Sequence, residues 1–403
     1  MNTRTRLPVT PMLAASMFFS GITYAATLPY ASLVGIDTLG MSPGNFATVM
    51  AFGGVFGTVV SLVLGYFSDK IRDRRVLVLM ATAAGVVANA LIYFWPSIEA
   101  FTIAVAVLVP IAGAAFSQSF AYIRVFYAKT NPTRADFMVT ALRTVFTGAW
   151  VIVPPIAGWI AAAFSIFDVY LVAGLSYGVI GAIYLVLMMN RATLVQVPPP
   201  VRAEGASLLS TFALPLGVLG GIVSLAVMTA AARILTFSVP LLIVTDLGGS
   251  VTDVGFYAAI TAAVEVPSML IWGWLVSQWT KETLLASAGI ILAVFMVGAA
   301  MSASVPMLFW LLLLNGFATA ALMGINISYV QEAIKGRVGL STSLLDVIAI
   351  AANLIGATAF GILTSGGDYR FALMVGAGVA VLGTLIMAMA NMKRLGKVLP
   401  LPA

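Results

Sequence analysis

The chain has 403 residues, of which 61% are hydrophobic and only 8% are charged. A soluble globular domain carries about 25% charged residues, so this chain would present too much apolar surface to water and is expected in lipid. The formal net charge of +6 is explained by the loops of a membrane protein, as shown below, and we expect no nucleic-acid partner.

The apolar segments predict an all-α polytopic membrane protein. A bilayer-spanning helix needs about 20 apolar residues, so about 12 transmembrane helices use up the chain and leave no room for a large soluble domain. The apolar runs are continuous and not alternating, which favours helices over a membrane barrel. In chain order, we expect spans at 12–36, 45–67, 76–95, 99–123, 138–162, 168–189, 212–245, 253–276, 284–303, 306–329, 340–363 and 370–391.

The charges of the loops predict the orientation of these spans. With the N-terminus in the cytoplasm, the cytoplasmic loops and termini hold sixteen Lys and Arg residues, whereas the outside loops hold Arg370 alone. This distribution is the positive-inside pattern. The outside loops carry carboxylates instead, such as Asp37, Asp168 and Asp246. Both termini are therefore expected in the cytoplasm, which requires an even number of spans.

The longest polar stretch, from Asn190 to Ser210, divides the predicted spans into six and six. It contains three consecutive prolines, which cannot continue a helix. We therefore expect an N-terminal six-helix bundle over 1–190, a cytoplasmic linker over 191–210 and a C-terminal six-helix bundle over 211–403. The alternative interpretation is that the stretch is simply a long loop.

Two segments at the cytoplasmic ends of the second and eighth spans are weakly similar, 65–70 and 273–278. Duplicated halves with a site between them are typical of transporters. The first segment, Gly65-x-x-x-Asp69-Lys70 followed by Arg74-Arg75, resembles the loop motif of the major facilitator superfamily.

Further segments in both halves resemble the sugar efflux transporter family of that superfamily. They are Asp69-x-x-x-Asp73-Arg74-Arg75, Gln118 to Arg124, Arg143 with Ala149 to Pro155, Glu265 to Ile271, and Gln331-Glu332 with Gly336 to Gly339. The resemblance implies the major facilitator fold, with two six-helix halves around a central cavity. It also implies proton-coupled export of sugars or glycosides across the bacterial inner membrane. Arg233 has no counterpart in this resemblance, which leaves the substrate open.

Ionisable side chains inside the predicted spans are the first candidates for function, because a charge within the bilayer is costly. Glu265 lies near the middle of the eighth span. A buried carboxylate without a partner can bind and release a proton near neutral pH, so Glu265 is the predicted proton carrier. Arg233 lies near the middle of the seventh span, where it would bind an anionic group of the substrate or pair with Glu265. The alternative for Glu265 is a structural ion pair with Arg233 or Arg143.

Asp346 and Arg143 lie about one and a half to two turns from the cytoplasmic ends of their helices. Asp346 is the second candidate for proton coupling, or an anchor between the halves. Because the chain has no histidine, any proton relay must use Asp or Glu. Arg143 is assigned to the conformational switch, with snorkelling to the interface as the alternative.

The resemblance implies that Asp69, Arg74 and Arg75 help to control the switch between the outward-open and inward-open states. A carboxylate just after a helix C-terminus is unfavourable unless cations compensate. The alternative, a solvated positive-inside loop, explains the arginines but not Asp69. Pro154 and Pro155 free backbone groups of the fifth span and bend it, so we expect a hinge there.

Gln118 and Asn315 are the predicted substrate-binding amides, because an amide offers both a donor and an acceptor to a hydroxyl-rich ligand. The resemblance places their helices, the fourth and the tenth, at the cavity. Tyr30 and Trp150 are predicted to stack on a sugar ring. The alternatives are interhelical hydrogen bonds for the amides and packing or interfacial anchoring for the aromatic residues.

We expect no enzyme activity, no cofactor and no metal. The chain has neither Cys nor His, and it shows no phosphate-binding loop. The expected partners are a sugar or glycoside, protons and the lipid bilayer, and nothing requires more than a monomer. The alternatives are a multidrug exporter of the same fold, whose cavity would hold few amides, and, more distantly, a membrane sensor or scaffold.

Overall fold

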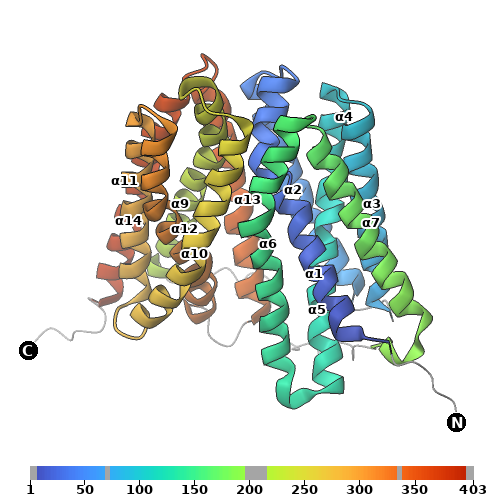
Figure 1. Cartoon of the computed structure of the whole chain (residues 1–403). Coiled ribbons are helices and arrows are strands. Elements are labelled where there is room, and N and C mark those ends of the chain that lie inside the picture. The colour runs from blue at the N-terminus through green and yellow to red at the C-terminus, as the bar shows by residue number, and fades with distance from the viewer. Residues whose placement is uncertain (1–6, 69–72, 196–215, 334–337, 396–403) are drawn as a thin grey trace, which may run out of the picture. The chain divides into compact units, whose positions relative to one another are not determined.

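The computed structural model describes residues 7–68, 73–195, 216–333 and 338–395, and all regular structure in these ranges is helical (Figure 1). Within them, 12 helical segments are long and apolar enough to cross a membrane. This confirms the predicted fold class. Many large apolar side chains remain exposed, such as Leu270, Trp310 and Met189, as expected for a surface that faces lipid.

The first six spans are built from long α-helices with short 3-10 and π segments at their ends. These elements are α1 Val9–Ala25, η1 Leu28–Tyr30, η2 Leu33–Thr38, α2 Pro43–Ser68, α3 Arg74–Phe94, α4 Ile98–Ile103, η3 Ala104–Leu108, α5 Val109–Thr130, η4 Pro132–Arg134, α6 Ala135–Ala163, α7 Asp168–Met189 and η5 Arg191–Thr193. The fourth span is one continuous helical segment from Ile98 to Thr130, seven residues longer at its end than the predicted 99–123.

The last six spans follow the same plan. Their elements are α9 Leu216–Leu241, η6 Leu242–Asp246, α10 Val251–Leu275, α11 Lys281–Met301, α12 Val305–Ala333, α13 Val338–Leu363 and α14 Tyr369–Leu395. Of the predicted linker, only residues 191–195 lie in the described ranges.

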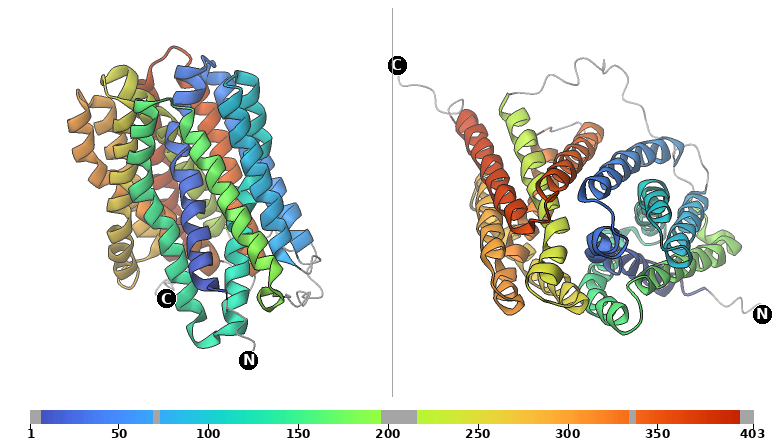
Figure 2. Two further views of the ribbon diagram at one scale, coloured as in Figure 1. Left: turned by 45° about the vertical axis from the view of Figure 1, so that its right-hand side comes forward. Right: turned by 90° about the horizontal axis from the view of Figure 1, so that it is seen from above.

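The chain forms two compact units, and α2 contributes to both. One unit comprises residues 1–30 and 56–201, and the other comprises 31–55 and 202–403. In each unit the helices run alongside one another, as the view along their axes in Figure 2 shows. The first part of α2 packs on α13, where Nδ2 of Asn353 donates to the carbonyl oxygen of Met50 (2.9 Å).

The core of the first unit lies among α1, α3, α5 and α7 and is rich in tyrosine. Tyr122 and Tyr184 are both buried, and their rings meet edge to face with centroids 5.7 Å apart. In the second unit, α9 packs against α13 and α14, and α10 packs against α12. These helix pairs position the candidate site residues described below.

The same turn follows α1 and α9, the first helices of the two predicted halves. In both places a π segment, η2 after α1 and η1, or η6 directly after α9, is followed by a glycine with positive φ, Gly40 (71°) or Gly248 (64°). An L residue with a side chain rarely adopts this conformation. The next helix is then capped by a serine: Ser42 Oγ accepts from Asn45 N (3.2 Å), and Ser250 Oγ accepts from Asp253 N (3.3 Å).

The backbone hydrogen bonds of the two turns also correspond. Met41 N donates to the carbonyl of Gly35 (2.9 Å), and Gly249 N donates to that of Ile243 (2.8 Å). In sequence, both turns read Leu-Gly-x-Ser-x-x-(Asn/Asp), at 39–45 and at 247–253. This repeat supports the duplication of the halves more strongly than the similarity of 65–70 and 273–278.

Candidate functional site

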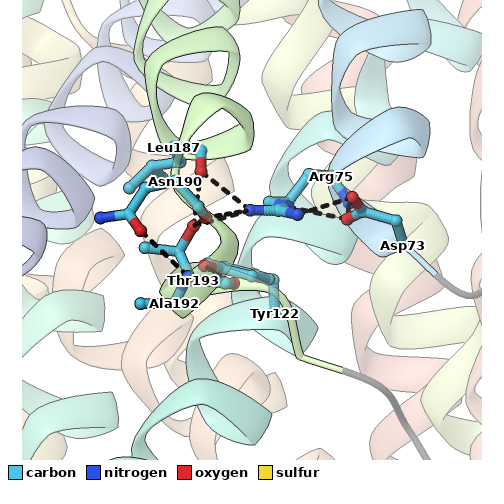
Figure 3. A network of polar contacts seen from close by, with 7 residues as sticks. All are labelled: Asp73, Arg75, Tyr122, Leu187, Asn190, Ala192 and Thr193. Carbon is cyan, nitrogen blue, oxygen red and sulfur yellow. Dashed lines mark hydrogen bonds and ion pairs between the residues drawn. The ribbon is translucent and has the colours of Figure 1, made fainter.

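A polar network surrounds Arg75 at the start of α3 (Figure 3). Only 3% of the Arg75 side chain is exposed. Its Nε and Nη2 donate to Oδ1 (2.8 Å) and Oδ2 (2.7 Å) of Asp73, which is a two-pronged ion pair. Its Nη1 donates to Oγ1 of Thr193 (2.6 Å) and to the carbonyl oxygen of Leu187 (2.8 Å). The buried guanidinium is therefore matched by acceptors on two sides.

Asp73 also caps α3, because its Oδ1 accepts from the backbone N–H of Arg75 (3.1 Å). Burial alone would raise the pKa of Asp73, but the hydrogen bonds and the charge of Arg75 outweigh that effect and hold the pKa below its ordinary value. Asp73 was absent from the predicted site. Asp73 precedes the predicted span at 76–95 by three residues, and an aspartate at the start of a helix is a strong N-cap signal, so the sequence contained the information to find it.

Thr193 joins three helices, α3, α5 and α7. Its backbone carbonyl accepts from the hydroxyl of Tyr122 in α5 (2.7 Å), and its own hydroxyl lies against the carbonyls at the end of α7. Through Arg75, the same residue is tied to α3. The first described residues of the predicted linker are thus fixed to the end of the first unit.

The other residues predicted for the switch are dispersed. Asp69 lies outside the described residues, so its relation to the arginines is not described. Arg74 is the half-buried first residue of α3, and the Arg143 side chain is exposed on α6. Pro154 and Pro155 lie inside α6, which continues through them from Ala135 to Ala163.

Tyr30 and Trp150 differ in their surroundings. Tyr30 has no exposed surface, and its hydroxyl donates to the backbone carbonyl of Pro154 (2.7 Å). It therefore joins η1 to the proline-containing part of α6. Trp150 is half-buried on α6.

The helix pair α10 and α12 brings two predicted site residues to adjoining turns. Nδ2 of Asn315 in α12 donates to Oγ1 of Thr261 (3.2 Å) and, at 3.5 Å, to the hydroxyl of Tyr257, both in α10. Glu265 follows Thr261 by four residues, so it lies on the same face of α10, one turn further along. Oδ1 of Asn315 is buried and has no partner in the described ranges.

Glu265 itself is half-buried and lies within a membrane-spanning segment. Its carboxylate has no hydrogen bond or ion pair with any described residue. Pro267, two residues further along, interrupts the backbone hydrogen bonding of α10. The carboxylate thus lies beside an irregular stretch of helix.

Arg233 and Asp346 are also without partners among the described residues, on α9 and α13 respectively. Arg233 forms no ion pair with Glu265 or with Asp346. Of the two predicted roles for Arg233, the pair with Glu265 is therefore not formed in this conformation. Gln118, in α5, is buried, and its Oε1 likewise has no partner in the described part of the chain.

A groove of about 510 Å³ lies between the first part of α2 and α13 and is mostly apolar, with Phe52, Leu354 and Ile362 in its lining. None of the predicted site residues lines it. Within the described residues there is no cluster of three or more potential metal ligands.

Comparison with known proteins places the chain in a family. The family model of the Major Facilitator Superfamily matches residues 13–223 and 221–398. Sugar efflux transporter C of Escherichia coli K12 is 28% identical over 81% of this chain and 82% of its own length. Sugar efflux transporter A of Dickeya chrysanthemi is 26% identical over 90% and 92%.

The solved structure of the nucleoside transporter NupG superimposes with a TM-score of 0.75 and covers 96% of this chain and 99% of its own, at 11% sequence identity. This likeness concerns the fold alone. The matches confirm the resemblance to sugar efflux transporters and the multi-pass membrane architecture. The chain belongs to the Major Facilitator Superfamily.

Proposed function

We propose that this chain is a secondary active transporter that exports sugars or glycosides in exchange for protons, by alternating access. A sugar substrate is supported by the relatives, which are named sugar efflux transporters and match along most of the chain. The observation that carries proton coupling is the Glu265 carboxylate, which lies inside a membrane span without a partner among the described residues. Such residues usually serve transport pathways or proton relays.

Glu265 couples a proton to the movement of α10 because protonation removes one unit of charge from a membrane-spanning helix. A charge within the bilayer is costly. The ionised and the protonated forms of Glu265 therefore favour conformations of α10 that differ in how far this side chain is exposed to water. Asn315, whose contacts lie one turn from Glu265, has an acceptor, Oδ1, that no described residue uses. A sugar hydroxyl that donates to Oδ1 of Asn315 would therefore bind to the helix pair, α10 and α12, that contains Glu265.

The remaining predicted residues have supporting roles in this proposal. Asp346 is the second proton-coupling residue, and Gln118 offers Oε1 to a substrate hydroxyl. Trp150 stacks on the sugar and Tyr30 supports the substrate site through Pro154. The segment that includes Asp69, Arg74 and Arg75, together with Arg143, Pro154 and Pro155, acts in the conformational switch.

We place the transporter in the bacterial inner membrane as a monomer with both termini in the cytoplasm, and it is not an enzyme. The chain contains no cysteine, so a single introduced cysteine would be the only thiol. Labelling such a residue with a membrane-impermeant reagent from either side of the membrane tests the orientation.

The purified full-length protein in liposomes provides the functional test. Neutral sugars, acidic sugars and cationic drugs would be offered to the protein under an imposed pH gradient. Glu265→Gln, Asp346→Asn and a control, Asp136→Asn, would be measured in parallel. Asp136 is an exposed carboxylate at the start of α6, so its variant removes the same charge outside the proposed coupling residues.

We expect a sugar to move against its gradient when protons flow, and Glu265→Gln to abolish that drive while Asp136→Asn retains it. Transport of drugs alone would establish the multidrug alternative. Full proton drive in Glu265→Gln together with its loss in Asp346→Asn would transfer the coupling role to Asp346. An absence of all flux from folded protein would contradict the proposal and favour a sensor or scaffold.

A further inference from the structure

The aliphatic part of the Arg233 side chain begins at a close contact between two helices, and this contact requires a glycine on the neighbouring helix. Arg233 lies on the side of α9 that packs against α13, opposite Gly356. A Cβ atom at Gly356 would lie 2.6 Å from Cβ of Arg233 and 2.7 Å from the carbonyl oxygen of Ala230. Neither contact is tolerated without a shift of the backbone, because a Cβ atom and a backbone carbonyl of α9 cannot move away independently of that helix. The position of Arg233 is thus fixed by close helix packing.

The guanidinium of Arg233 has unused hydrogen-bonding capacity. Its Nε is inaccessible and has no hydrogen-bond partner among the described residues. Its two terminal nitrogens also have no partner there, but they are not among the fully buried atoms. A guanidinium offers five donors in a rigid fork and always carries its charge. The stem is therefore packed, and the charged end remains accessible.

The surroundings of Arg233 strengthen its attraction for an anion. Phe237, one turn further along α9, forms a three-ring cluster with Phe46 of α2 and Phe360 of α13. The ring centroids are 5.5 Å apart for Phe46 and Phe237, 6.0 Å for Phe46 and Phe360, and 5.5 Å for Phe237 and Phe360. All three rings are buried. An apolar wall that excludes water lowers the local dielectric constant, and a charge interaction beside it is stronger than in water.

No carboxylate in the described part of the chain neutralises this cation. Neutral hydroxyls or water can accept its hydrogen bonds but cannot balance its charge. We propose that the substrate carries an anionic group, a carboxylate or a phosphate on a sugar, and that Arg233 binds this group with two parallel hydrogen bonds. This inference rests on the proposed sugar transport and names the substrate class for it.

The test compares three sugars of the same ring structure in liposomes that hold the full-length protein: glucose, glucuronate and glucose 6-phosphate. The first lacks an anionic group, the second carries a carboxylate and the third a phosphate. We expect at least one acidic sugar to be transported with a kcat/KM about tenfold or more above that of glucose, as suits a charge-assisted hydrogen-bonded pair. The preferred acidic sugar identifies the anionic group.

Three variants connect that preference to Arg233. In Arg233→Gln, kcat/KM for the acidic sugar divided by kcat/KM for glucose should fall to about one. Arg233→Lys keeps the charge but loses the forked guanidinium, so it should keep part of the preference. Gly356→Ala, which displaces Arg233, should raise the KM for the acidic sugar. Arg134→Gln, at an exposed arginine, and Gly378→Ala, at a glycine with open space around it, are the matched controls and should retain the wild-type preference.

The outcomes separate the inference from the proposed function. Transport of glucose with no preference for either acidic sugar would leave sugar transport intact and overturn the inference. A preference that persists in Arg233→Gln would also overturn it. If none of the three sugars moves and none binds to the folded protein, the proposed function fails and the inference fails with it.

Discussion

Two arginines in this chain, the buried Arg75 and the half-buried Arg233, have opposite surroundings, and the difference distinguishes a charge with protein partners from one that we propose binds the substrate. Arg75 is matched by Asp73 on one side and by Thr193 and the end of α7 on the other. Arg233 has no partner among the described residues. A buried charge costs free energy unless its environment compensates. The described residues compensate this cost at Arg75 and not at Arg233, as our proposal that Arg233 binds an anionic group of the substrate requires.

The largest effect on stability should follow from Arg75→Gln. This change leaves the Asp73 carboxylate and the acceptors around Thr193 without their cation. We expect the free energy of unfolding to fall by about 3–5 kcal/mol, as for the removal of one partner of a buried ion pair. Unfolding in mixed micelles, followed by tryptophan fluorescence, measures the change. A loss no greater than that of Arg134→Gln would show that the network contributes little to stability.

Arg233→Gln should affect stability much less and in the opposite direction. It removes a charge that has no partner in the described part of the chain, so the free energy of unfolding should be unchanged or rise by up to about 1 kcal/mol. The same unfolding assay, with Arg75→Gln as the reference, gives this value. A loss comparable to that of Arg75→Gln would show that Arg233 has a structural partner, and the contrast between the two arginines would disappear.

The smallest predicted effect is on the pH dependence of stability, and it tests the role of Asp73 as the partner of Arg75. Because the pKa of Asp73 lies below its ordinary value of 3.8 in the folded protein, its contribution to stability is present above that value. The contribution is lost as the pH falls through the lowered pKa. Wild-type protein should therefore lose more stability on acidification below about pH 4 than Asp73→Asn does. Parallel acid-unfolding curves of the two proteins would contradict this assignment.

The fold was predictable from the sequence because lipid imposes a simple rule on the chain. Every span must be long, apolar and helical, so composition and the positions of lysine and arginine led to twelve spans. The division of α2 between the two units was not predictable. It depends on where Met50 meets Asn353, two residues that are separated by most of the chain.

The candidate site was predictable only in part. Charges inside spans stand out in a sequence, which is how Glu265, Arg233 and Asp346 were found. The residues that pair with such a charge cannot be recognised in the sequence in the same way. Thr193 is an ordinary residue after a helix, and its contact with Arg75 depends on how α3 and α7 pack together. That Arg75 has partners, and that Arg233 has none among the described residues, could be known only from the arrangement of the helices.

The matching turns after α1 and α9 distinguish the features that the two halves share from those that occur in one half only. A π segment, a glycine with positive φ and a capping serine recur at 39–45 and 247–253. Because the same turn occurs in both halves, it is a feature of the helical scaffold and carries no information about the substrate. Glu265 and Arg233 have no such duplicate that we recognise in the first half. The residues that determine what this protein transports are therefore to be sought where its two halves differ.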